Sequence, residues 1–200
     1  MEEFGNISLA PTTIDGDALH IPLRDNVVDL ALTSPPYINA FDYVRTLRLE
    51  NLWLKIANED ELRKKKKGYV GTESINIRQE RSQLTIIKSS SLLKKYYDSI
   101  TMLDTKRALI VKRFFEDMKK NLQEVYRVLK PGSKYVIVIG NSTIRKVDVE
   151  SWKVLADIAT PIGYKYIGHF AYQIKNPYIR IPRGTKGGKI ALDHVLILEK

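Results

Sequence analysis

The pattern of apolar and polar positions predicts an α/β protein. Continuous apolar runs at Val27–Thr33 and Tyr135–Ile139 are typical of buried strands. Between them, Lys112–Leu129 carries apolar residues at helical spacing, which predicts a long amphipathic helix. Lys130-Pro131-Gly132 then supplies the residues that stop a helix. A strand, a helix and a second strand therefore follow one another in the central part of the chain.

Further elements flank this central unit. A short strand ending in an acidic turn is expected at Thr13–Ala18, a helix from about Tyr43, and a helix at 149–160. Two last strands are expected at Tyr164–Ile174 and His194–Leu198. Two hundred residues are enough for one core, so we expect a single domain over 1–200. Within it, residues 58–108 are predicted to form a basic, mainly helical insertion that contacts the target.

The strand Val27–Thr33 stops at Ser34-Pro35-Pro36-Tyr37. Neither proline can donate a backbone hydrogen bond, and both have a fixed φ, so the strand has to end there. In open α/β sheets, ligands bind outside the carboxyl ends of the strands. This proline corner is therefore expected to present a serine hydroxyl, backbone carbonyls and an aromatic ring at an active-site edge.

Composition narrows the chemistry. The chain has no cysteine, which excludes disulfides, thiolate metal sites and cysteine nucleophiles. A net charge of +10 favours a polyanionic partner, with nucleic acid first. No apolar run is long enough for a membrane span and the N-terminus lacks a basic secretory segment, so a cytoplasmic protein with no membrane partner is expected. The three histidines are scattered, and no metal site is predicted.

The corner resembles the Ser-Pro-Pro-Tyr signature of S-adenosylmethionine-dependent methyltransferases that act on amino groups of DNA. The resemblance implies a Rossmann-like methyltransferase fold, present in part as strands three to seven, with the last two forming an antiparallel hairpin. It implies catalytic roles for Ser34, Pro35, Pro36 and Tyr37, which hold an extruded base. Acceptors at Ser34 and the Pro35 carbonyl would draw the lone pair of the amino group back onto nitrogen, and the Tyr37 ring would stack on the base.

The same resemblance places S-adenosyl-L-methionine beside the acidic turn that precedes the corner. The cofactor candidates are Asp17, Ala18, Thr33 and Ser34. Asn141, after the second buried strand, is a secondary candidate at the same sheet edge, although asparagine is common in turns.

Nucleic-acid contacts are expected in three places: directly behind the corner, in a basic run, and in a basic glycine-rich loop near the C-terminus. Lysine and arginine there would meet phosphates and give affinity rather than sequence choice, whereas the plainer interpretation is a solvated surface. The candidate residues are Asn39, Tyr43, Arg45, Arg63, Lys64, Lys65, Lys66, Lys67, Arg180, Arg183 and Lys186.

One required part is not found in the sequence. The family holds the methionine end of the cofactor with a Phe-x-Gly-x-Gly-like loop after its first strand, and this chain has no such loop. We therefore expect a second chain, or a homo-oligomer, to complete the sheet and the cofactor loop, since an uncovered strand edge invites pairing.

These features predict a DNA methyltransferase, as found in restriction-modification systems, with N4 of cytosine favoured over N6 of adenine. Two alternatives stay open. One is an RNA methyltransferase acting on guanine N2 or another amino group. The other is a non-catalytic nucleic-acid-binding subunit. Cofactor binding separates the last alternative from the others.

Overall fold

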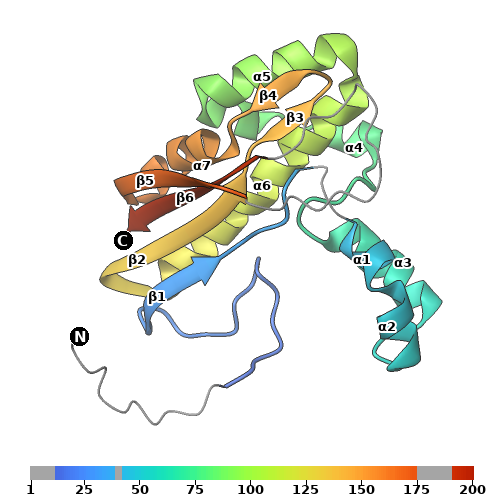
Figure 1. Cartoon of the computed structure of the whole chain (residues 1–200), viewed down its shortest axis with the longest axis horizontal. Helices are drawn as coiled ribbons and strands as arrows, with labels where there is room; N and C mark the ends of the chain where they lie inside the picture. The colour runs from blue at the N-terminus through green and yellow to red at the C-terminus, as the bar shows by residue number, and fades with distance from the viewer. Residues whose placement is uncertain (1–11, 39–41, 175–190) are drawn as a thin grey trace.

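A mixed four-stranded sheet forms the centre of the molecule. The computed structural model describes residues 12–38, 42–174 and 191–200. The strands β1 (Val28–Thr33), β2 (Leu129–Gly140), β5 (Lys165–Gln173) and β6 (Leu192–Glu199) are arranged in the order β1-β2-β6-β5. β1 pairs parallel with β2, whereas β6 is antiparallel to both β2 and β5 (Figure 1). The fold is α/β, as predicted, and its last two strands form the expected antiparallel pair.

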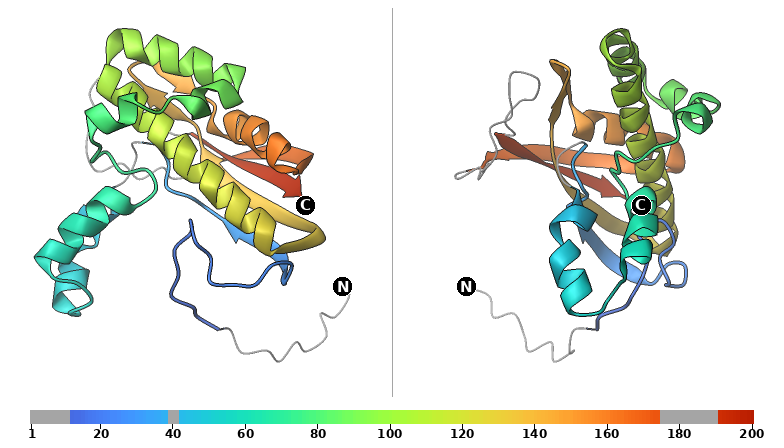
Figure 2. Two further views of the ribbon diagram at one scale, coloured as in Figure 1. Left: turned by 180° about the vertical axis from the view of Figure 1, so that it is seen from behind. Right: turned by 90° about the vertical axis from the view of Figure 1, so that its right-hand side faces the viewer.

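One face of the sheet carries the core. Tyr135, Ile137 and Ile139 alternate along β2 and are almost completely buried, with Leu196 and Leu198 of β6 beside them. The helices α6 (Thr105–Val128) and α7 (Ser151–Ala159) cover this face, and α5 (Ser91–Leu103) packs against α6, as Figure 2 shows from behind. α6 begins at Asp104, whose carboxylate accepts from the backbone N–H of Arg107, and buries one broad apolar stripe.

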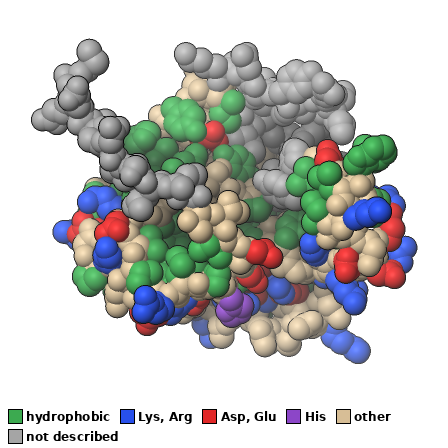
Figure 3. All heavy atoms as spheres, turned by 90° about the horizontal axis from the view of Figure 1, so that it is seen from below, with side chains coloured by type: hydrophobic (Ala, Val, Ile, Leu, Met, Phe, Trp, Pro, Cys, Tyr) green, Lys and Arg blue, Asp and Glu red, His purple; other side chains and the backbone are tan. Residues whose placement is uncertain are grey.

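The opposite face of the sheet is exposed at both of its edges. The register of β1 on β2 places Leu30 and Leu32 on the same face as Lys134 and Val136, away from α6. Leu30 is 60% exposed and Leu32 is 69% exposed. Seen from below, hydrophobic side chains gather over the middle of the molecule, and charged ones gather at both of its sides (Figure 3). β1 is thus an edge strand with an apolar, accessible face.

Residues 58–108 are mainly helical, as the sequence predicted. They contain the helices α3 (Glu59–Gly68), α4 (Ile77–Arg81) and α5, and the 3-10 turn η1 (Thr85–Ser89). A buried ion pair fastens α4 to α6, because Lys112 Nζ lies 2.8 Å from Glu80 Oε2 and both side chains are nearly inaccessible. The ends of α3 and α5 are fixed by side-chain caps at Asn58 and Ser90.

Three helices that overlap the start of this insertion project from the body of the molecule as an arm. We define the arm as residues 43–68, which comprise α1 (Tyr43–Thr46), α2 (Arg48–Trp53) and α3 (Figure 1). The single helix predicted from Tyr43 is wrong, since a turn at Leu47 separates α1 from α2. Trp53 is 81% exposed and Leu54 is largely exposed, because the arm does not pack on the sheet.

Two predicted boundaries also differ. Thr13–Ala18 is not a strand, because the segment is exposed, pairs with no strand of the sheet, and forms only an isolated bridge between Asp17 and His20. α6 holds the end of this segment and the connector after it: Asn121 donates to Ala18 O at 2.8 Å, and Arg127 donates to Ile21 O at 2.9 Å. α6 ends at Val128, as the stop signal at Lys130–Gly132 predicted, but β2 begins at Leu129 and not at Tyr135.

A hairpin that the sequence did not predict follows β2. Its strands are β3 (Ser142–Ile144) and β4 (Val147–Val149), joined by Arg145 and Lys146, which both have positive φ. Positive φ at both central residues matches the right-handed twist of a hairpin. Arg145 also pairs with Asp104, the residue that caps α6, which ties the hairpin to the helical side.

Candidate active site

The proline corner is packed into the protein on one side and exposed to solvent on the other. Pro35 and Ile38 are buried, whereas Ser34 is exposed. The hydroxyl of Ser142, at the start of β3, donates to the backbone carbonyl of Ile38 at 3.2 Å. The carboxyl ends of the parallel strands β1 and β2 therefore meet at one edge of the sheet, with the Ser34 side chain accessible there.

The orientation of Tyr37 is set by a residue far along the chain. Its hydroxyl donates to Asp193 Oδ1 at 2.6 Å, from the second residue of β6. Burial raises the pKa of Tyr37 well above its usual value, and the hydrogen bond to Asp193 raises it further, while a smaller contribution from Ser34 lowers it. Tyr172 of β5 lies beside Asp193 in register. Tyr37 thus stays protonated, and its ring is held at the corner by β6.

The insertion closes against the other side of the corner. Gly71 has φ +85°, and a Cβ built on it would lie 3.3 Å from Pro36 Cβ and 4.0 Å from a ring carbon of Phe114 on α6. A side chain at this position would need a strained backbone and a tighter contact than is usual. Glycine at position 71 therefore lets the insertion approach the prolines, a role that the sequence alone did not indicate.

The acidic turn lies farther along α6. Asp17 is exposed, and its Oδ1 accepts from the backbone N–H of Leu19 at 2.9 Å, while the Ala18 carbonyl is held by Asn121. Asn121 is seven residues beyond Phe114, which neighbours the corner through Gly71, so the turn lies roughly 10 Å from the corner along the helix axis. The turn and the corner are therefore separate points anchored on one helix.

Two other positions lie at the carboxyl ends of β1 and β2. Thr33 is half-buried and is the last residue of β1, opposite Ile137. Asn141 directly follows β2, and its buried side-chain oxygen has no hydrogen-bond partner within the described residues. An unpaired acceptor at this edge costs free energy unless a donor reaches it.

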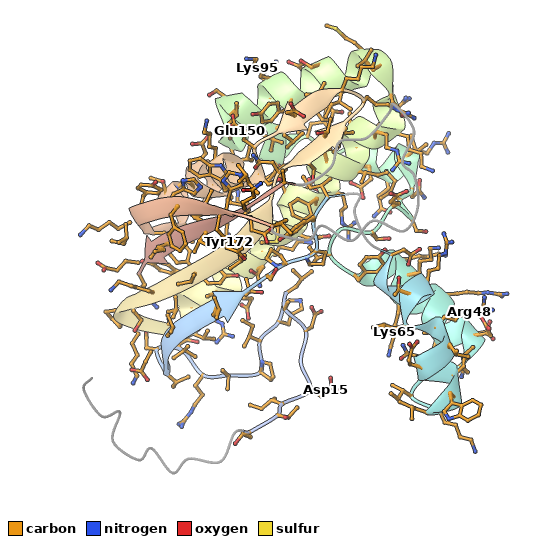
Figure 4. All side chains as sticks on the ribbon, in the orientation of Figure 1. Asp15, Arg48, Lys65, Lys95, Glu150 and Tyr172 are labelled. Atoms are coloured by element: carbon orange, nitrogen blue, oxygen red, sulfur yellow. The ribbon has the colours of Figure 1, made fainter. Side chains whose placement is uncertain are left out.

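The predicted nucleic-acid residues fall into three groups. The basic run Arg63–Lys67 is exposed on α3, and Figure 4 shows Lys65 on the arm, away from the sheet. Arg45 is also exposed, and only the backbone of Tyr43 is described, in α1. Asn39, Arg180, Arg183 and Lys186 lie outside the described residues.

One lysine of the basic run is already paired. Lys66 Nζ lies 2.9 Å from Asp42 Oδ2. Burial alone would raise the pKa of Asp42, but hydrogen bonds from Lys66 and from the Arg45 backbone hold it below its usual value. Lys66 therefore joins the arm to the segment behind the corner, and its neighbours Lys64, Lys65 and Lys67 are better candidates for phosphate contacts.

Two of the three histidines, His169 of β5 and His194 of β6, lie against each other although they are far apart in the sequence. His169 Nε2 and His194 Nδ1 are 2.9 Å apart, and the Trp152 ring stacks on His169 with a centroid distance of 3.6 Å. In the described part of the chain, no three His, Cys, Asp or Glu side chains form a group that could hold a metal ion. No helix in that part is long and apolar enough to cross a bilayer.

A parallel β1–β2 pair that ends at the proline corner, followed by the antiparallel strands β6 and β5, agrees with the partial Rossmann-like fold that the sequence resemblance implies. The chain is similar to Type II methyltransferase M.MvaI from Kocuria varians, with 27% identity over 186 residues, which cover 88% of this chain and 40% of that protein. It is also similar to Type II methyltransferase M.AvaI from Nostoc sp., with 26% identity over 68% of this chain and 30% of that protein. M.BsoBI from Geobacillus stearothermophilus is 27% identical over 72% of this chain and 33% of its own length.

The predicted resemblance to methyltransferases is thereby confirmed, and the chain spans less than half the length of these curated relatives. No protein-family model matches the chain. A structure from Thermus thermophilus, named as a DNA modification methylase in complex with S-adenosyl-L-methionine, has a TM-score of 0.44 and 16% identity over 90% of this chain and 50% of that one.

Proposed function

We propose that this chain is the target-binding part of an S-adenosylmethionine-dependent DNA methyltransferase of a restriction-modification system. The observation that carries the proposal is the corner itself. An exposed Ser34 stands at the carboxyl edge of two parallel strands, beside a Tyr37 ring fixed by Asp193. Similarity to Type II methyltransferases over 88% of the chain supports the same activity.

The corner offers the chemistry that amino-group methylation needs. The lone pair of an exocyclic amino nitrogen is delocalised into the base, and acceptors for its two N–H groups draw that pair back onto nitrogen. Ser34 Oγ and the Pro35 carbonyl are the proposed acceptors. Tyr37 presents its ring to the extruded base, because its hydroxyl is occupied by Asp193. Positioning of the nitrogen in line with the methyl carbon supplies much of the rate.

The residues present fit one end of the cofactor. The anchored turn at Asp17–Ala18 offers a free carboxylate oxygen, and Thr33 and Ser34 lie at the end of β1. These residues would hold the nucleoside end of S-adenosylmethionine, and the bound cofactor would supply the electrophilic methyl group. The methionine end requires a glycine-rich loop, which we assign to a second chain beside the free edge of β1.

The target base is proposed from the motif. Serine at its first position favours N4 of cytosine, with N6 of adenine next, and both products need the same two acceptors. The exposed lysines of α3, on an arm that leaves the body, suit contact with DNA phosphates outside the base pocket. The corner chemistry serves RNA guanine N2 equally, so transfer to RNA is the alternative outcome of the test.

Methyl transfer from labelled S-adenosylmethionine tests this function, with DNA and RNA substrates and with cofactor affinity measured by calorimetry. The chain is assayed alone and co-expressed with the products of its flanking genes. Ser34→Ala should lower transfer about a hundredfold, as expected for loss of a preorganised hydrogen bond, and should leave affinity nearly intact. Asp17→Ala should weaken cofactor binding roughly tenfold through loss of a charged hydrogen-bonding group.

Ser82→Ala is the matched control. Ser82 is exposed at the end of α4 and is far from the corner in the sequence. It should change neither quantity. Equal loss of transfer and affinity in both Ser34→Ala and Asp17→Ala would contradict the assigned roles. A chain that never binds the cofactor, alone or in complex, would leave only nucleic-acid binding.

A further inference from the structure

The most unusual surface of the molecule is the sheet face opposite α6, which we term the open face. On the edge strand β1 it presents Leu30 and Leu32, which are 60% and 69% exposed. On the far edge it presents Phe170 and Tyr172 of β5, which share this face through their register with Val195 and Asp193. Phe170 is 54% exposed, and Figure 4 shows Tyr172 over the sheet.

The open face lacks the features that normally protect an edge strand exposed to solvent. Soluble proteins protect an edge strand with charges, prolines or bulges, yet the open face of β1 carries only leucine at its two central positions. The charged residue of the strand, Asp29, alternates to the other face and pairs with Lys130. Parallel strands are normally covered by helices on both sides, whereas the described helices cover β1 and β2 on one side.

We propose that the open face and the free edge of β1 dock a companion chain whose strand pairs parallel with β1 and whose amphipathic helix covers Leu30 and Leu32. This inference rests on the proposed function and identifies the second chain by its chemistry. A parallel strand ends at the same sheet edge as β1, so the loop that follows it would arrive beside Ser34. An antiparallel strand would bring that loop to the opposite edge.

A second copy of this chain does not satisfy the same geometry. A two-fold dimer through the β1 edges pairs the strands antiparallel, which places the two Ser34 corners at opposite ends of the joint sheet. Each copy also carries a net charge of +10, which opposes association. The curated relatives leave more than half of their length for elements that this chain does not match. A strand-and-helix companion therefore accounts for the open face better than self-association.

The test uses the complete chain, co-expressed with the products of its flanking genes. By light scattering, the chain alone should be a monomer. Backbone amides of Val28–Thr33 that face away from β2 should exchange rapidly in the isolated chain. In a complex with a flanking-gene product, exchange of these amides should slow at least tenfold. Leu30→Lys with Leu32→Lys should weaken that complex at least tenfold without lowering the melting temperature of the isolated chain.

Leu103→Lys is the matched control, since Leu103 is 63% exposed at the end of α5 on the helical side, and it should leave the complex intact. A homodimer, an undiminished complex of the doubly substituted chain, unchanged exchange in β1, or failure of every flanking-gene product to bind would each overturn the proposal. A complex that protects β1 but transfers no methyl group would refute the proposed function and leave the docking inference standing.

Discussion

Replacement of Asn121 by alanine should have two separately measurable effects. It should lower the stability of the fold, and it should weaken cofactor binding at the Asp17–Ala18 turn. Asn121 is 8% exposed and makes two hydrogen bonds: its Oδ1 accepts from the Tyr135 hydroxyl at 2.6 Å, and its Nδ2 donates to Ala18 O at 2.8 Å. Tyr135 lies in the core of β2 with 1% exposure, and burial raises its pKa far above the usual value. Its hydroxyl is therefore a donor that depends on Asn121.

The expected cost follows from these two bonds. An unsatisfied buried hydroxyl costs about 1–3 kcal/mol, and the bond to the exposed turn contributes about 1 kcal/mol, so Asn121→Ala should lower the free energy of unfolding by about 2–4 kcal/mol. Tyr135→Phe removes the hydroxyl itself and should cost about 1 kcal/mol. In the double variant no hydroxyl is stranded, so the two losses should fall short of additivity by about 1–2 kcal/mol.

Urea unfolding of the four proteins measures the cycle, and calorimetry with S-adenosylmethionine measures the turn. Asn121→Ala should weaken cofactor binding because Ala18 loses its anchor, whereas Tyr135→Phe leaves that anchor in place and should bind normally. Strict additivity of the unfolding free energies would refute the stranded-hydroxyl argument. Equal cofactor affinity in the two single variants would refute the assignment of the Asp17–Ala18 turn to the cofactor.

Two further predictions concern charge. Replacement of Lys64, Lys65 and Lys67 by glutamine should reduce the slope of log affinity against log salt for DNA by up to about 3, because each phosphate that a lysine no longer neutralises lowers the slope by nearly one unit. The His169–His194 pair should make stability depend on pH: burial lowers the pKa of both side chains in the folded state, so the stability that they contribute is present above the ordinary pKa of 6.5 and is lost as pH falls below it. Thermal melting across that range should show the loss, and His169→Gln should reduce it.

Each of these predictions has a control elsewhere on the molecule. For DNA binding, glutamine at Lys88, Lys95 and Lys106 removes the same charge from the helical side, where Lys95 lies in Figure 4, far from the arm. An equal change of slope in both triple variants would show that the basic run contributes only as general surface charge and makes no specific phosphate contacts. For pH, His20 is exposed, and His20→Gln should leave the melting profile unchanged.

The strands and the corner could be predicted from the sequence because local chemistry decides them. The apolar run that precedes two prolines has to end there, and the stripe from Phe114 to Leu129 has only one helical face to bury. Thr13–Ala18 has equally strand-like residues, but a strand exists only with a neighbour. This segment stays exposed without a neighbouring strand, and only its last residue, Ala18, is held by an α6 side chain, a contact that no local pattern predicts.

The contacts that complete the site were beyond such reasoning. Asp193 is 156 residues from Tyr37 in the sequence, and it reaches the corner because β6 inserts beside β2 and begins at the edge where β1 ends. The role of Gly71 could not be predicted either, since its positive φ and its approach to Pro36 depend on how the insertion folds back. Register and chain reversal placed both residues, and neither leaves a short motif.

The contact between Tyr37 and Asp193 also indicates different roles for Tyr37 and Ser34 within the corner. A phenol that is half-buried and donates to a carboxylate has its pKa raised, so it is protonated at neutral pH and is not suited to act as a base. What it can offer to a ligand is its ring, held in one orientation by β6. The hydroxyl of Ser34 is exposed, and it is therefore the side-chain acceptor of the corner that a base can reach. We therefore expect the Tyr37 ring to recognise the base by stacking and the Ser34 hydroxyl to activate it by hydrogen bonding.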